Sequence, residues 1–121
     1  LRKINPYVQV EVHAVKLTSE NIFPMFGTVD VMIEAFDRAD QKAMLLQAFT
    51  VQKPDVPFIG ASGMAGFGPE ETIGVKKMGR NIYIVGDLET GACPGCGLMA
   101  PRVGIAAHMQ ANLALRLIVE S

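Results

Sequence analysis

Hydrophobic and polar positions follow different periods along this chain, and each period predicts a different element. Residues 8–15 alternate apolar and polar side chains, which is the pattern of a strand with one covered face. Residues 29–36 are nearly all apolar, which is typical of a parallel strand buried on both faces. Between them, the polar residues 18–21 offer cap oxygens for a short helix that contains Pro24 and ends at Gly27.

The middle of the chain predicts a second helix and strand. Apolar residues recur at helical spacing over 39–51, and Lys53-Pro54 ends the run. Residues 56–61 form a short apolar strand that leads into the glycine-rich segment 60–68, where the backbone could approach a ligand or another chain closely. We expect that segment to be either a flexible cover over a neighbouring site or a turn-rich connection. Strand, helix, strand, helix and strand in this order predict an open α/β sheet with right-handed crossovers.

The pattern changes again in the last third. Residues 72–77 and 80–85 are β-rich runs around Met78-Gly79, which predicts an antiparallel hairpin at the sheet edge. Pro101 suits the first turn of a closing helix over 103–119, whose many small residues favour close packing. The predicted fold class is therefore α/β: an open Rossmann-like sheet with parallel strands first, then the hairpin and the closing helix, in a single domain over 1–121.

Composition limits the classes of partner. The chain has 121 residues, half of them hydrophobic, with a net charge of -1, which indicates a folded domain rather than disorder. Its 11 Lys and Arg residues are scattered, so we expect no nucleic-acid surface. The sequence contains no signal-peptide pattern and no apolar run long enough to span a membrane, so we expect a cytoplasmic protein without a membrane partner.

Asp37 is the best-placed acidic residue for chemistry. It follows the apolar run 29–36, and ligands of parallel sheets bind beyond the carboxyl ends of the strands. A carboxylate there can hold a magnesium ion that bridges phosphate oxygens. The alternative use of Asp37 is to cap the helix that begins near Ala39.

Three charged neighbours of Asp37 leave alternatives open. Glu34 lies inside the apolar run, where burial is costly, so it needs either a partner or a strand end near water. Arg38 and Lys42 could face a phosphate, or they could be solvated helix positions.

Cys93 and Cys96 form a single C-x-x-C motif. Such a pair supplies two thiolates to zinc, whereas a closed structural site needs four ligands, and His108 is the only downstream nitrogen candidate. The pair could also be a redox dithiol, although it does not begin a helix after a strand, or simply two structural thiols.

Four segments taken in order carry a family resemblance: Ile4-Asn5-Pro6, residues 29–37, residues 56–63 and residues 99–111. Together they resemble the ThiF/MoeB/HesA family of ubiquitin-activating-like adenylyltransferases. The amino-acid sequences of residues 60–68 and 81–87 look most like those of the short ThiF branch, which serves a thiamine sulfur carrier.

The resemblance implies a specific activity. Family members use ATP and magnesium to adenylate the C-terminal glycine carboxylate of a ubiquitin-like sulfur carrier protein, and they often pair as homodimers. It implies that Asp37 is catalytic and organises magnesium and the phosphates, with Arg38 and Lys42 near the nucleotide. The sequence departs from the family pattern at Glu34, Phe36, Arg38 and Lys42, where Asp, Thr, Asn and Arg are usual.

The resemblance also implies what this chain does not carry. The nucleotide loop, the ribose-binding acid and the catalytic lysine of the family precede the position of Ile4, so we expect a C-terminal portion that does not hold ATP alone. Zinc-type members carry two C-x-x-C pairs, and only Cys93 and Cys96 are present here. Two alternatives are a non-catalytic docking or dimerisation module, and the sister branch that activates a carboxylate on transfer RNA.

Overall fold

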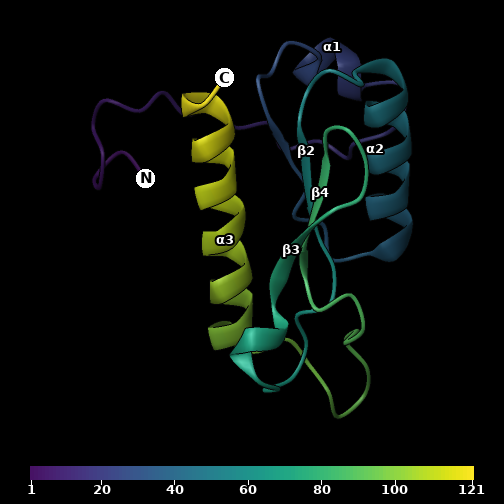
Figure 1. The fold of residues 1–121 in the computed structure, drawn as a ribbon. Helices are drawn as coiled ribbons and strands as arrows, with labels where there is room; N and C mark the ends of the chain where they lie inside the picture. The colour runs from purple at the N-terminus through teal and green to yellow at the C-terminus, as the bar shows by residue number, and fades with distance from the viewer.

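A computed structural model describes all residues 1–121 as a sheet covered by helices on both faces. The helices are α1 (Ile22–Phe26), α2 (Ala39–Gln52) and α3 (Ala100–Val119), with a 3-10 turn, η1, at Glu70–Thr72. The strands are β1 (Met32–Ile33), β2 (Phe58–Ala61), β3 (Gly74–Lys77) and β4 (Ile82–Gly86). Figure 1 shows α3 on one side of the sheet and α2 on the other, with α1 beside α2.

The sheet has the order β1-β2-β4-β3. Strands β1, β2 and β4 run parallel, with Met32 opposite Phe58 and Phe58 opposite Ile82. Strand β3 is antiparallel to β4 and forms the edge. This arrangement confirms the predicted α/β class, the hairpin at the sheet edge and the closing helix.

Alternation along β2 divides the core between the two helical layers. Successive side chains of a strand point to opposite faces, so Phe58 packs under α2 while Ile59 packs under α3. All four residues of β2 are buried, as expected for a central parallel strand. Ala106 of α3 is fully buried in the cluster that contains Ile59, so a small side chain here does bring the closing helix close to the sheet.

Two strand predictions need correction. Residues 8–15 form no strand; they are mainly exposed, and Val12 and Val15 project into solvent. The prediction was wrong because alternation provides one apolar face but no partner, and no strand of this sheet lies beside the segment. The run 29–36 does contain a parallel strand, but only Met32–Ile33 pair as β1, and Ile33 is 43% exposed because β1 is an edge strand.

No helix of the structure combines the length and the apolar character that crossing a lipid bilayer requires.

Candidate functional site

The carboxyl ends of β1, β2 and β4 meet at one edge of the sheet because these strands are parallel. The first turns of α2 and α3 lie at the same edge, with the connections 62–73 and 87–99 (Figure 1). This carboxyl edge is the candidate site.

Asp37 lies at this edge, between β1 and α2. Its side chain is exposed and enters no hydrogen bond or ion pair. Arg38 is the N-cap residue of α2, and no side chain caps the helix, so the capping alternative for Asp37 is wrong. Its carboxylate therefore remains free for a ligand beyond the end of β1.

Glu34 is buried, with 3% of its side chain exposed, and its partner is Lys42. The Lys42 ammonium donates to both carboxylate oxygens of Glu34, at 3.0 and 3.2 Å, and to the carbonyl of Ala61 at 3.2 Å. The backbone carbonyl of Glu34 accepts a hydrogen bond from Gln110 of α3 at 3.3 Å. A partner, rather than a strand end near water, therefore accommodates Glu34.

The two carboxylate oxygens of Glu34 and the carbonyl of Ala61 together occupy the three hydrogens of the Lys42 ammonium. No donor is left over for a phosphate in this arrangement, and the predicted nucleotide contact of Lys42 stays a prediction. Arg38, in contrast, is solvated, although as the N-cap residue it precedes the helix: its guanidinium is exposed and contacts the Asp40 carboxylate at 3.0 and 3.1 Å. Exposed pairs of this kind are weak, so Arg38 can exchange Asp40 for an anionic ligand at little cost.

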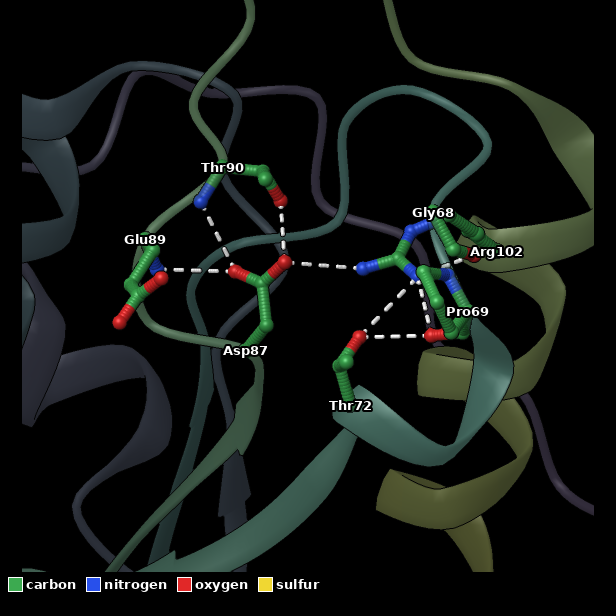
Figure 2. Close-up of polar contacts among 7 residues, drawn as sticks. All are labelled: Gly68, Pro69, Thr72, Asp87, Glu89, Thr90 and Arg102. Atoms are coloured by element: carbon green, nitrogen blue, oxygen red, sulfur yellow. Dashed lines mark hydrogen bonds and ion pairs between the residues drawn. The ribbon is translucent and has the colours of Figure 1, made fainter.

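A second polar cluster lies where β4 ends, and it links α3 to two loops (Figure 2). Arg102, in the first turn of α3, is only 4% exposed and contacts Asp87 at 2.9 Å. Its other terminal nitrogen donates to the carbonyl oxygens of Gly68 and Pro69, at 2.8 and 2.9 Å. The Arg102 Nε is buried without a partner. The guanidinium thus holds together the end of β4, the segment after β2 and the start of α3.

Asp87 is the acceptor at the centre of this cluster. The Thr90 hydroxyl donates to one carboxylate oxygen, and the backbone N–H groups of Thr90 and Glu89 donate to the other at 2.8 Å. The hydrogen bonds from Thr90, followed by those from Glu89 and the charge of Arg102, lower the pKa of Asp87 to about 2 against an opposing effect of burial. Asp87 is therefore a firmly ionised structural carboxylate.

Sequence reasoning assigned no role to Asp87 or Arg102, although two signals were present. Asp87 directly follows the β-rich run that forms β4, much as Asp37 follows the apolar run 29–36, and Arg102 is a cation in the first turn of a helix that is otherwise rich in apolar and small residues.

The glycine-rich segment is a hydrogen-bonded connection rather than a free cover. Backbone groups tie it to the loop after β4: Asp87 donates to Gly63, Leu88 donates to Ser62, and Gly66 donates to Gly97, at 2.9, 3.1 and 3.0 Å. Gly86 has a φ of 137°, and a Cβ there would overlap the Ser62 carbonyl, so this close approach requires glycine.

Cys93 and Cys96 lie in that same loop and are free thiols. No group of three or more His, Cys, Asp and Glu residues comes together anywhere in the chain, so the pair lacks further ligands for a closed zinc site. His108 lies instead on the outer side of α3, in a shallow groove with Gly104 and Met109.

The comparisons with known proteins agree with this topology. The sequence profile of the ThiF family matches residues 1–121, and the chain therefore belongs to the ThiF family. Among solved structures, the chain is similar to the E. coli tRNA N6-threonylcarbamoyladenosine dehydratase TcdA, crystallised in complex with ATP. The TM-score is 0.67 with 15% identity, which shows a shared fold. No curated protein matches the chain.

The match covers 99% of this chain and 63% of the TcdA chain, so this chain spans less than two thirds of the length of its neighbour. The residues present fit one part of a magnesium–nucleotide site. Carboxylate oxygen is the donor that magnesium prefers, and Asp37 presents a free carboxylate at the carboxyl edge.

Proposed function

We propose that this chain is the C-terminal portion of an adenylyltransferase that uses ATP to activate the C-terminal carboxylate of a ubiquitin-like sulfur carrier protein in thiamine biosynthesis. The observation that carries the proposal is the free Asp37 carboxylate at the carboxyl edge of a ThiF-family sheet. The nucleotide loop would come from residues outside this chain.

The reaction is a displacement at phosphorus. The glycine carboxylate of the carrier attacks the α-phosphorus of ATP, the bond to the bridging oxygen of pyrophosphate breaks, and an acyl adenylate and pyrophosphate form. A magnesium ion held by Asp37 would neutralise charge on the phosphates. Arg38 is exposed and pairs only weakly with Asp40, so its guanidinium is free to turn toward the same phosphates.

Charge favours a protein substrate over transfer RNA. The chain has 12 acidic and 11 basic residues, and Lys42 and Arg102 are engaged in ion pairs with Glu34 and Asp87. Binding of transfer RNA depends on clustered free cations that contact phosphates. The similarity to TcdA rests on the fold and does not select a substrate.

A second copy of the chain is the other partner we propose. Leu115, Ile118 and Val119 of α3 are exposed and follow i, i+3, i+4 spacing, so they share one helix face. Sedimentation velocity should give a dimer for the complete protein and a monomer for Leu115→Glu. A monomeric wild-type protein would contradict this.

ATP–pyrophosphate exchange by the complete protein tests the substrate. We expect exchange to require the carrier protein and to vanish with a carrier that lacks its C-terminal glycine. Exchange that depends on transfer RNA instead would assign the sister branch. Binding of the carrier without any exchange would assign a docking module.

A further inference from the structure

We propose that Cys93 and Cys96 form a redox-active dithiol that closes reversibly to an intramolecular disulfide with small-molecule disulfides such as glutathione disulfide. This site lies outside the adenylation chemistry and uses the one sequence motif that the proposed function leaves unexplained.

The backbone around the two thiols is already shaped for closure. Cys93 and Cys96 exchange two backbone hydrogen bonds, N–H of Cys93 to the carbonyl of Cys96 at 2.9 Å and the reverse at 2.8 Å. Residues paired in this way have Cα atoms about 5.5 Å apart, which lies within the range that disulfides span. Ring closure therefore requires little movement of the backbone.

The residues between the cysteines fix this turn. Pro94 restricts its own φ, and Gly95 has a φ of 81°, which is the combination that a type II turn requires. A side chain on Gly95 would meet no atom within 4 Å, so glycine is needed there for its backbone conformation and not for space.

The two thiols are suited to different steps. Cys93 is exposed, whereas Cys96 is half-buried, and the charge of Cys93 raises the pKa of Cys96. The Cys93 thiolate attacks one sulfur of the disulfide oxidant, and the first thiolate leaves. Cys96 then loses its proton and attacks Cys93 Sγ, which releases the second thiol. Two protein thiols are oxidised and one disulfide is reduced to two thiols.

The position of the pair connects it to the carboxyl edge. Cys96 Sγ lies against Gly66, 3.6 Å from where a Cβ on that glycine would be. The next residue, Gly97, accepts a hydrogen bond from Gly66, and Leu98 pairs with Ala65. The two thiols, and the disulfide that they form, therefore lie beside the segment that follows β2.

Equilibration of the protein in glutathione redox buffers, followed by acid quenching, alkylation and mass spectrometry, tests the proposal. As the buffer becomes more oxidising, we expect the number of alkylated thiols in the wild type to fall from two to none. The protein should lose the mass of two hydrogens, and no glutathione adduct should accumulate. The Cys96→Ser variant should keep a stable glutathione adduct on Cys93. Glutathione adducts on both wild-type cysteines, or two thiols that stay alkylatable in every buffer, would overturn the proposal.

A matched pair of glycine variants tests the role of the turn. Gly95→Ala should lower the equilibrium constant for closure by about fivefold, because alanine resists the left-handed conformation: the reduced loop of the variant can relax away from it, whereas the disulfide holds the turn in place. Gly91→Ala lies in the same loop, also in open space but without a positive φ, and should leave closure unchanged. Equal closure in both variants would contradict the geometric argument.

Discussion

The Lys42 ammonium lies 3.0 Å from a carboxylate oxygen of Glu34 whose side chain is almost fully buried. The two residues come from α2 and from the end of β1, and the same ammonium reaches the carbonyl of Ala61 at the end of β2. The pair therefore fixes the first turns of α2 against the carboxyl edge. In this structure the Glu34–Lys42 pair holds α2 in place against the ends of β1 and β2.

Loss of Lys42 should destabilise the fold strongly. Lys42→Met leaves a buried carboxylate without its cation, which typically costs about 3–5 kcal/mol of unfolding free energy. Urea denaturation measures the loss. Arg38→Met provides the control: Arg38 is exposed, so its removal should change stability by less than about 0.5 kcal/mol. Equal losses in both variants would contradict the account of Lys42.

The same pair should show energetic coupling. Glu34→Gln removes the carboxylate charge, so Lys42→Met should cost less in that background than in the wild type. A double-mutant cycle in urea measures the difference. Additive losses would indicate that the two side chains do not stabilise each other.

Stability at low pH should depend on Asp87. Its folded pKa, about 2, lies below the value near 3.9 usual for an unfolded Asp, so the folded state binds the proton more weakly. The contribution to stability is then full above about pH 4 and is lost as the pH falls toward 2. Asp87→Asn should flatten this part of the stability profile and should also destabilise at neutral pH, because Arg102 loses its ionic partner.

Urea midpoints measured from pH 7 to pH 2 check this expectation. Asp30→Asn is a suitable control, since Asp30 is exposed and makes no hydrogen bond through its side chain. An Asp87→Asn profile that runs parallel to the wild type would refute the assignment.

Two glycines should respond to alanine in opposite directions. Gly86→Ala places a Cβ against the Ser62 carbonyl at a φ of 137°, so we expect severe destabilisation. Gly104 lies in the interior of α3 with open space where its Cβ would be, so Gly104→Ala should stabilise the helix by about 0.5–1 kcal/mol. Thermal unfolding distinguishes the two, and a stable Gly86→Ala variant would disprove the close approach.

The sequence predicted most of the fold because local signals mark its elements: apolar runs and the proline and glycine residues that end them. The helix expected over 39–51 is α2 at Ala39–Gln52, and the hairpin was placed to within about two residues at each end. Residues 8–15 failed because pairing of a strand depends on a neighbour that alternation does not reveal.

The candidate site was harder to predict because its contacts join residues distant in the chain. Arg102 meets Gly68 and Pro69, and Gln110 meets Glu34 across 76 positions. No local sequence pattern encodes such a long-range contact. Asp37, by contrast, could be placed at the carboxyl edge because only the end of one strand was needed to locate it.

The most direct test of the central claim is ATP–pyrophosphate exchange by the complete protein carrying Asp37→Asn, with Asp30→Asn as the matched control. Both carboxylates are exposed, so both variants should fold, as circular dichroism and urea midpoints would verify. We predict that exchange is abolished in Asp37→Asn, because the carboxylate that we propose as the magnesium ligand is gone, and that it is retained in Asp30→Asn. Exchange at the wild-type rate in a folded Asp37→Asn protein would contradict the account.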